Sequence, residues 1–524
     1  MACKHCGLSD DSLNIPLKTP DIDSFPGSSN DLWAIVRNTD AEIARVETLL
    51  NQLILRRVLL KKEINYRSSP LLRISSDVTS QIFDDCLKQE KHEQAGHWHV
   101  SERDSRSALK PPLLFGSVCS AWRELAWSTP SLWSSITLEL GTSPLISAIL
   151  VAEWLSRSGQ CALTISLTST CTVMNTWNRN IITTLAGVSE RWRHITFNLP
   201  PLYYEGFRSV EGRLPLLESV TMIYRAWMGY GVDDSRIFSV APQLRVVHFD
   251  KFCSSNIVLP LAQLTTLSGY PCNDVLHCLS VLESAIQLVH ASFIISAPTW
   301  PPPSRSPSPG PNSHRVVAPR LQSLEVNVGM GRSVNMLLET LDLPDVRELS
   351  FRLPSDLWSR STFKFRPSSF TSFILRSACH LRSLSIFDCL TDDSSLLHCM
   401  QVIPSLTHLA IERVEDITEQ TIRNLTPNTG FDVPLLPNLQ TLTISSTTLA
   451  VDFVELHAML SARWGRTDNR AVARLKFVSI TGTGIHEASV IPGIPLLQQF
   501  IEEGMQVSVN TVVYNYPNAD RVWL

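Results

Sequence analysis

The sequence predicts an α/β protein in which a helical N-terminal part precedes a long solenoid with a parallel sheet on its concave face. Two observations carry this prediction. Apolar residues near the N-terminus follow helical spacing, whereas beyond residue 180 an apolar pattern typical of buried strands recurs along the chain. The chain has 524 residues, of which 44% are hydrophobic, so it can bury a core of this size.

The chain begins with a polar segment that leads into an amphipathic helix. Residues 1–38 are rich in Pro, Ser, Asp and Gly, a composition that cannot offset the entropy of ordering, so we expect a disordered tail. Residues 39–67 carry apolar residues at alternating spacings of three and four, with Arg57 at the remaining position: Ile43, Val46, Leu50, Leu53, Leu60 and Ile64. This pattern predicts a helix of about three heptads, which either packs on its own chain or self-associates as a coiled coil.

A short helix and a charged loop are expected next. Within residues 71–87, Ser75, Ser76 and Asp77 supply acceptors for the free amides of a first helical turn. The apolar face of this helix consists of Ile74, Val78, Ile82, Phe83, Cys86 and Leu87. Residues 88–110 are strongly charged and have no apolar period, which predicts an exposed loop. The two histidines of its "HWH" have no partner cluster, so we expect no metal there.

The stretch "VCSAWRELAWSTPSLWSSI", residues 118–136, predicts a second helix that runs into a turn. Leu114, Val118 and Trp122 lie at helical spacings, followed by Leu125 or Ala126. The "STP" that follows ends the helix, because the residue before a proline is biased away from helical conformation. The "SLWSSITL" beyond it predicts the start of a strand.

The repeat beyond residue 180 consists of an apolar residue, another three positions later and a third two positions after that. It matches L-x-x-L-x-L, the strand segment of a leucine-rich repeat. Ten copies occur, with starts 20 to 36 residues apart once a weaker copy at Leu264 and Leu267 is included: Trp192/Ile195/Phe197, Leu217/Val220/Met222, Leu244/Val247/Phe249, Leu288/Ala291/Phe293, Leu321/Leu324/Val326, Val346/Leu349/Phe351, Leu381/Leu384/Ile386, Leu406/Leu409/Ile411, Leu439/Leu442/Ile444 and Leu475/Val478/Ile480.

Because a single unit cannot bury its own apolar face, these repeats predict a solenoid over residues 137–510. Segments such as 273–285 and 333–341 have helical periodicity and are expected on its outer face. The positions expected to line the concave face include Gln322, Glu325, Arg382 and Ser385. The Pro-rich stretch 297–315 predicts an extended loop, with a phosphorylation or ligand segment as the alternative, and residues 511–524 form a C-terminal tail.

The composition argues against several classes of function. A net charge of −4 does not attract nucleic acid or an anionic membrane, so we expect neither as a partner. No window approaches the about 18 apolar residues of a membrane span, and the N-terminus lacks the pattern of a signal peptide, which predicts an intracellular protein. The 12 cysteines are too sparse for a disulfide framework and fit reduced thiols.

Motifs for catalysis or for a cofactor are missing from the sequence. It contains no G-x-x-x-x-G-K-[ST], G-x-G-x-x-G, H-E-x-x-H or G-x-S-x-G. Cys3 and Cys6 have the spacing of half a zinc site, but the next cysteine is Cys86, so we expect an unstructured terminus rather than bound metal. An enzyme with an unrecognised site is the less favoured class, because a solenoid usually binds a partner.

Residues 69–136 resemble the F-box, in the form common in large fungal families of F-box proteins. The likeness rests on "SPLLRISSDVTSQIF" and "PPLLFGSVCSAWRELAWSTPSLWSSI". The family pattern of a Leu-Pro-x-Glu start, an Ile-Phe pair, a Val-Cys-x-x-Trp and a final Leu-Trp falls on Ile74, Ser75 and Asp77, on Ile82 and Phe83, on Val118, Cys119 and Trp122, and on Leu132 and Trp133. Ser75 stands where proline is usual, Asp77 replaces Glu, and the insertion 88–110 lengthens the first loop. The heptad helix and the C-terminal "LQQFIEEGMQVSV" also look like this family.

The resemblance implies a substrate receptor of an SCF-type ubiquitin ligase, in the cytoplasm, the nucleus or both. The F-box would dock on the Skp adaptor, which joins a cullin and a RING subunit, while the repeats hold a target protein. The adaptor-binding surface that it implies consists of Ile74, Val78, Ile82, Phe83, Leu114, Val118, Trp122, Leu132 and Trp133. Trp122 is alternatively a core residue of the module. Such a receptor uses no cofactor and is not itself an enzyme; the alternative is a repeat scaffold whose degenerate F-box no longer recruits a ligase.

Overall fold

The computed structural model divides the chain into two compact units, Met1–Leu132 and Trp133–Leu524, which we describe separately. The residues that the structure describes are 29–94, 112–141, 148–169, 171, 173–223, 236–250, 257–295, 315–328, 332–352, 366–387, 392–414, 417–427, 434–446, 449, 452–464, 472–482 and 497–511. The expected tail over 1–28, most of the Pro-rich loop and the tail beyond 511 therefore lie outside the described residues.

The first unit opens with a long helix, α1 (Ser29–Ser68), none of whose residues is buried. The helix begins ten residues before the expected start at residue 39, so the prediction of a disordered segment up to residue 38 is wrong for 29–38. This segment contains Leu32 and Val36, which continue the apolar spacing of the following heptads. The prediction of disorder used the average composition of residues 1–38, which does not show the helical spacing within 29–38.

Four further helical elements complete the first unit. They are η3 (Pro70–Arg73), α2 (Ser76–Gln94), α3 (Leu113–Val118) and α4 (Ser120–Ser128). As expected, Ser75 caps the start of α2, because its hydroxyl accepts a hydrogen bond from the backbone N–H of Val78 at 3.4 Å. The expected loop from residue 88 is wrong up to Gln94, since the backbone stays helical through Lys, Gln and Glu, which are good helix formers.

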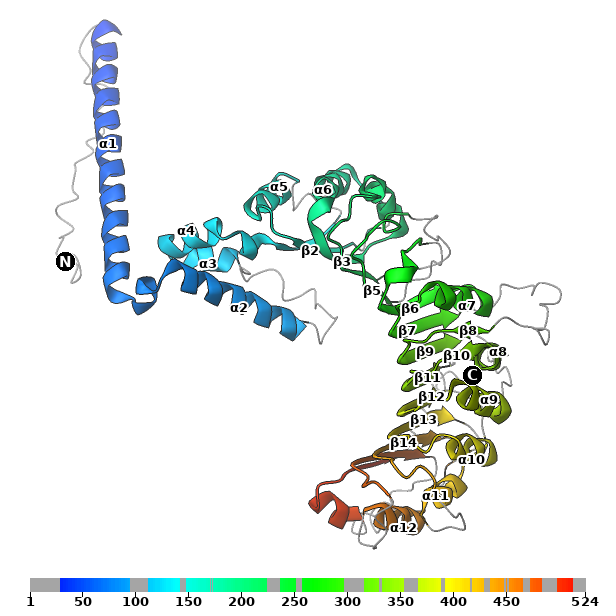
Figure 1. The fold of residues 1–524 in the computed structure, drawn as a ribbon. Helices are drawn as coiled ribbons and strands as arrows, with labels where there is room; N and C mark the ends of the chain where they lie inside the picture. Colours follow the sequence, from blue (N-terminus) through cyan, green and yellow to red (C-terminus); the bar gives the residue numbers. More distant parts are fainter. Residues whose placement is uncertain are drawn as a thin grey trace, which may run out of the picture. The chain divides into compact units, whose positions relative to one another are not determined.

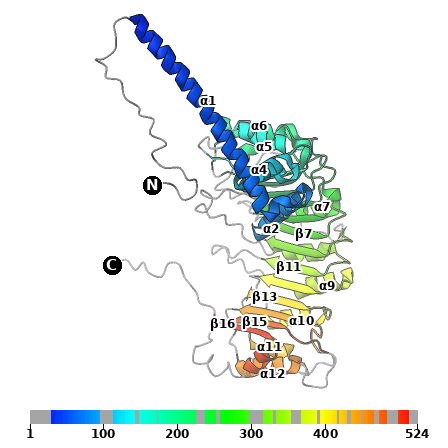
Figure 2. The ribbon, with the colours of Figure 1, turned by 90° about the vertical axis from the view of Figure 1, so that its left-hand side faces the viewer.

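The second unit is built on one 14-stranded sheet in which every neighbouring pair of strands is parallel. Its strands follow one another in chain order (Figure 2). They are β1 (Ser135–Glu139), β2 (Leu163–Thr168), β3 (Trp192–Asn198), β4 (Ser219–Ile223), β5 (Val246–Asp250), β6 (Thr266–Cys272), β7 (His290–Ile295), β9 (Ser323–Val328), β11 (Glu348–Arg352), β12 (Ser383–Phe387), β13 (His408–Val414), β14 (Thr441–Ser446), β15 (Phe477–Gly482) and β16 (Gln506–Thr511). Strands β8 (Val316–Val317) and β10 (Leu341–Asp342) form a separate parallel pair.

Helices connect the strands and lie along one side of the sheet, as α7 to α10 do in Figure 1. The turn η4 (Pro130–Trp133) precedes β1. The elements between strands are α5 (Ala148–Arg157), α6 (Thr176–Ala186), η5 (Ser189–Arg191), η6 (Pro201–Val210), η7 (Leu261–Gln263), α7 (Val275–Ser284), α8 (Arg332–Thr340), α9 (Pro367–Ser377), α10 (Asp393–Gln401), α11 (Glu419–Leu425) and α12 (Phe453–Trp464). Parallel strands require such crossovers. Because the described helices lie on one side, the opposite face of the sheet carries no described helix.

The core lies between the sheet and these helices. Every residue of the ten predicted apolar triplets is buried, with at most 5% of its surface exposed, so the expected inward positions are confirmed. The strand start predicted at "SLWSSITL" is confirmed by β1. Strands β1 and β2 lie outside the ten copies and use Ile136 and Leu138, and Ile165 and Leu167, for the same core. In strands such as β2 and β9, buried and half-exposed residues alternate, so every second side chain faces the open side of the sheet.

Three arginines join successive units of the core. Arg191, Arg376 and Arg463 each donate hydrogen bonds to backbone carbonyls 27 to 38 residues earlier in the chain. These acceptors include Leu155, Leu338 and Leu425 in the last turns of α5, α8 and α11, where carbonyls have no backbone partner within their own helix. Burial lowers the pKa of all three guanidinium groups, that of Arg463 to about 10.

Candidate functional site

The helical module of the first unit has an aromatic core of its own. The rings of Phe83 on α2 and Phe115 on α3 stack with centroids 4.2 Å apart, and Trp122 on α4 meets Phe83 edge-on at 5.0 Å. Phe83 is 1% exposed and Phe115 is 7% exposed. Because each of the three helices contributes one ring, the cluster fixes how they pack against each other.

Two further contacts explain the "GSVCSAW" stretch. A Cβ atom added to Gly116 would overlap the indole ring of Trp127, so glycine lets this ring lie directly on the backbone of α3. The thiol of Cys119 accepts a hydrogen bond from the backbone N–H of Trp122 at 3.5 Å and so caps the start of α4. Trp127, for which the sequence indicates no role, therefore packs inside the module.

Five of the nine predicted adaptor-facing residues are exposed apolar side chains on this module. They are Ile74, Val78, Ile82, Leu114 and Val118, with exposed fractions between 36% and 59%. Val78 and Ile82 lie one turn apart on α2, and Leu114 and Val118 lie one turn apart on α3. Each helix thus presents an apolar pair to solvent, next to the residue that it contributes to the aromatic core.

The structure corrects three of the other four residues. Phe83, Leu132 and Trp133 are at most 2% exposed, so their side chains do not reach the surface. Trp133 belongs to the second unit, where its ring meets Trp154 edge-on at 4.8 Å and its carbonyl accepts the indole N–H of Trp154 at 2.9 Å. Trp122 is half-buried against Phe83, in keeping with its alternative role in the core.

The second candidate surface is the open face of the parallel sheet. Its middle row holds one residue from each strand and consists almost entirely of small side chains: Thr137, Ser166, Thr196, Thr221, His248, Ser268, Ser292, Glu325, Ser350, Ser385, Ala410, Thr443, Ser479 and Ser508. A register shift between Leu267 and Tyr270 interrupts the row between β6 and β7. Glu325 brings a carboxylate into the row and accepts hydrogen bonds from Ser292 at 3.1 Å and Asn327 at 3.5 Å.

The positions named from the repeat pattern divide into two kinds. Glu325 and Ser385 lie on this middle row, as expected. Gln322 and Arg382 lie just before their strands, where their carbonyls accept the backbone N–H groups of Arg347 and of Thr407 and His408. The backbone of these two positions is therefore part of the hydrogen-bonding ladder that joins neighbouring strands.

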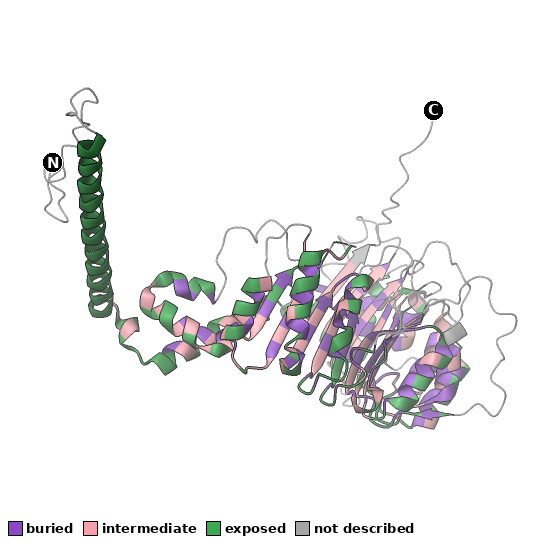
Figure 3. Ribbon diagram, turned by 90° about the horizontal axis from the view of Figure 1, so that it is seen from above, coloured by how far each residue is buried: buried purple, intermediate pink, exposed green. Residues whose placement is uncertain are grey.

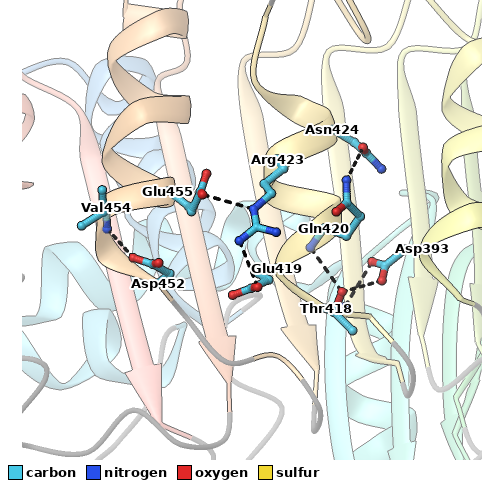
Figure 4. A network of polar contacts seen from close by, with 9 residues as sticks. All are labelled: Asp393, Thr418, Glu419, Gln420, Arg423, Asn424, Asp452, Val454 and Glu455. Carbon is cyan, nitrogen blue, oxygen red and sulfur yellow. Dashed lines mark hydrogen bonds and ion pairs between the residues drawn. The ribbon is translucent and has the colours of Figure 1, made fainter. Parts of the chain in front are cut away.

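A network of polar contacts links the outer helices α10, α11 and α12. Figure 4 shows Asp393, at the start of α10, accepting hydrogen bonds from the hydroxyl of Thr418 at 2.6 Å and from its backbone N–H at 3.1 Å. Arg423 forms ion pairs with Glu419 at 3.0 Å and Glu455 at 3.2 Å, which link α11 to α12. These contacts hold neighbouring outer helices together.

Within the described ranges, no three His, Cys, Asp or Glu side chains come together in a way that could hold a metal ion. Cys3, Cys6 and the two histidines of "HWH" lie outside the described residues. The thiols of Cys278 and Cys399 are buried, and desolvation raises the pKa of both, that of Cys399 to about 12.

Comparisons with known proteins add little to this description. No protein-family model matches the chain, and no curated protein matches its sequence. A solved structure of a Bacteroides fragilis protein from a structural genomics consortium is similar to 62% of this chain and 76% of its own, with 12% sequence identity and a TM-score of 0.31. In the described part of the chain, no helix combines the length and the apolar character needed to cross a membrane.

Proposed function

We propose that the chain is the substrate-recognition subunit of an SCF-type ubiquitin ligase. Residues 69–132 act as an F-box that binds the Skp adaptor and, through it, a cullin and a RING subunit. The parallel-sheet unit acts as a leucine-rich-repeat-like solenoid whose concave face, the open face of the sheet, holds a target protein. The chain acts in the cytoplasm, the nucleus or both, and the transfer chemistry is left to other subunits.

The observation that carries this proposal is that α2 and α3 each present a pair of exposed apolar side chains, one helical turn apart. Val78 and Ile82, together with Leu114 and Val118, stay at the surface although the aromatic core behind them is closed. A small module that keeps medium-sized apolar side chains in water at such positions gains free energy when a partner covers them. Ile74, at 36% exposed, extends this set at the start of α2.

The sheet supports the second half of the proposal. The middle row of its open face offers many hydroxyl groups and few bulky side chains, so along this row a bound chain can approach the backbone closely and form hydrogen bonds. Holding the target in one orientation raises the effective concentration of its lysine side chains near the conjugating enzyme. The contribution of this chain to the reaction is therefore positioning.

Adaptor binding is tested by copurifying the full chain with the Skp adaptor. We expect the wild type to bind, and Leu114→Asp or Val118→Asp to weaken binding by at least about tenfold, because each places a charge in the apolar contact. Ala121→Asp, which adds the same charge at an exposed position of α4, is the matched control and should bind as the wild type does.

Failure of the folded wild type to bind the adaptor would remove the ligase role and leave the repeat scaffold as the function. Target binding is tested separately by affinity capture under proteasome inhibition. Ser385→Arg adds bulk to the middle row and should remove captured target, whereas Leu375→Arg on the exposed side of α9 should not. Equal loss in both variants would place the target elsewhere.

A further inference from the structure

Helix α1 carries a long apolar seam that no described residue covers. In the heptads set by Ile43 and Val46, the added N-terminal turns contribute Leu32 and Val36 to the same positions. The whole seam is Leu32, Val36, Ile43, Val46, Leu50, Leu53, Leu60 and Ile64, interrupted by Thr39 and Arg57, and its eight apolar residues are between 41% and 62% exposed. Figure 3 shows α1 exposed along its full length.

The seam does not face the rest of its unit. Lys62, which forms an ion pair with Glu124 of α4 at 3.2 Å, lies on the side of α1 opposite the seam. The contact with the module therefore leaves the apolar side free. Five heptads of exposed apolar residues are sufficient for a two-helix coiled coil, whereas an isolated helix gains nothing from this pattern.

Charge is distributed unevenly along α1. The half before residue 49 contains four acidic and two basic residues, and the half from residue 49 onward contains one acidic and five basic residues. Two copies in parallel would align halves of like charge. Two copies in antiparallel orientation align each acidic half with a basic half.

The charged residues beside the seam also favour antiparallel over parallel pairing of two α1 helices. In a parallel pair, Glu42 of one copy would face Glu47 of the other, and Arg56 would face Lys61, so like charges would meet on both sides. In an antiparallel pair, Glu42 faces Arg56 twice. The remaining like-charged contact in this arrangement is a single one, between the two copies of Glu47.

The interruptions of the seam fix the register. When the paired residue numbers add up to 96, Leu32 faces Ile64, Val36 faces Leu60, Ile43 faces Leu53 and Val46 faces Leu50. The same register sets Thr39 opposite Arg57, so the two polar positions meet each other and every apolar position meets an apolar one. It also overlaps the two helices over residues 29–67, nearly their full length.

We propose that α1 is covered by α1 of a second copy of this chain, in an antiparallel two-helix coiled coil with this register. Two chains joined in this way carry their helical modules at opposite ends of the coiled coil, because α1 leads into the module at residue 69. The proposal does not depend on the ligase role, since it uses no residue of the adaptor-binding surface.

The seam is tested by measuring the mass of the full-length protein by sedimentation equilibrium over a concentration series. The wild type should be a dimer, and Leu50→Glu should make it monomeric by placing a charge in the central layer. Leu55→Glu, on the opposite side of the helix and 61% exposed, is the matched control and should remain dimeric. A monomeric wild type, or equal disruption by both variants, overturns the proposal.

Orientation is tested by reversing charges beside the seam. In the antiparallel dimer, Glu42→Arg and Arg56→Glu each replace two attractive contacts with repulsive ones and should raise the dimer dissociation constant by about tenfold. The double variant should restore the wild-type constant. In a parallel dimer each single variant would instead create an attractive contact and tighten the dimer, and that result would overturn the antiparallel arrangement.

Discussion

The ring of Phe83 stacks on that of Phe115 with the two planes only 5° apart, and each phenylalanine directly follows an exposed apolar residue in the sequence. Ile82 and Leu114, the residues that precede them, are 44% and 43% exposed. Neighbouring residues on each helix thus have different tasks: one closes the core of the module, and the other remains available to a partner.

Phe83→Ala is expected to lower the free energy of unfolding of the helical module by about 3–4 kcal/mol, because it leaves a cavity between α2, α3 and α4. Hydrogen exchange of the α3 and α4 amides measures this loss locally. Ile82→Ala, on the surface, should change the same amides by about 1 kcal/mol or less. Similar losses for the two variants would contradict the division between core and surface.

Gly116→Ala is expected to destabilise the module by about 1–3 kcal/mol, since the new methyl group collides with the indole ring of Trp127. The measurement is again the exchange rate of the α3 and α4 amides. Adding Trp127→Leu to Gly116→Ala should recover part of the loss, because the smaller side chain leaves room for the methyl group. An alanine that costs nothing would show that this contact is loose.

Arg463→Met is expected to destabilise the C-terminal part of the sheet by about 3 kcal/mol. The guanidinium donates to the carbonyls of Leu425 at 2.7 Å, Leu435 at 2.6 Å and Leu436 at 3.0 Å, and methionine leaves all three without this donor. Arg463→Lys should recover only part of the loss, because a single ammonium nitrogen cannot reach the three carbonyls that the separate nitrogens of the guanidinium group reach. Denaturation in urea measures the change.

The matched control for this variant is Arg208→Met. The Arg208 side chain is exposed, and its ion pair with Glu205 at 3.9 Å lies in solvent, so we expect a change within about 0.5 kcal/mol. A loss as large as that of Arg463→Met would mean that removing any arginine destabilises the unit, and the carbonyl contacts would not explain the effect.

The contribution of Cys399 to the free energy of unfolding is expected to fall as the pH rises from 9 to 12. Burial raises the pKa of Cys399 from its usual 9.0 to about 12, so in this range the unfolded chain loses the thiol proton while the folded chain keeps it. The free energy of unfolding then decreases by up to about 1.4 kcal/mol per pH unit from this group. Burial of Tyr270 raises its pKa to about 12 and acts in the same direction above pH 10.

Urea denaturation of the reduced protein at a series of pH values measures this dependence. Cys399→Ala should give a smaller loss of stability with pH than the wild type, because it removes one of the groups that titrate differently in the two states. Cys86→Ala removes an exposed thiol of α2 and is the control. Identical pH profiles for the wild type and Cys399→Ala would contradict the prediction.

The long parallel sheet could be predicted because the short sequence of each repeat is sufficient to identify its buried residues. Leu349 and Phe351, for example, are separated by one residue, as an alternating strand requires, and both are buried. Strand β1 also follows the repeat spacing, in Trp133, Ile136 and Leu138, but Trp133 was assigned to a different motif, so this copy was not counted with the ten. The row of hydroxyl groups depends on strand register, which the sequence of a single strand does not determine.

The candidate adaptor surface was predicted only in part. A helical period identifies one apolar side of α2, but it does not separate Ile82 from Phe83, which are adjacent in sequence and differ in burial. That separation depends on Phe115, which follows the long insertion and meets Phe83 only in the folded module. Trp133 was assigned by its motif, whereas it belongs to the second unit together with its partner Trp154 on α5.

Each residue of the middle row marks a known distance along the sheet. Adjacent strands are about 4.8 Å apart, and each of the 14 strands contributes one residue to the row. Thr137 and Ser508 mark its two ends, and each substitution between them alters one position along the row and leaves the others unchanged. A substitution scan along this row would therefore report where on the sheet a bound partner begins and ends, without a structure of the complex.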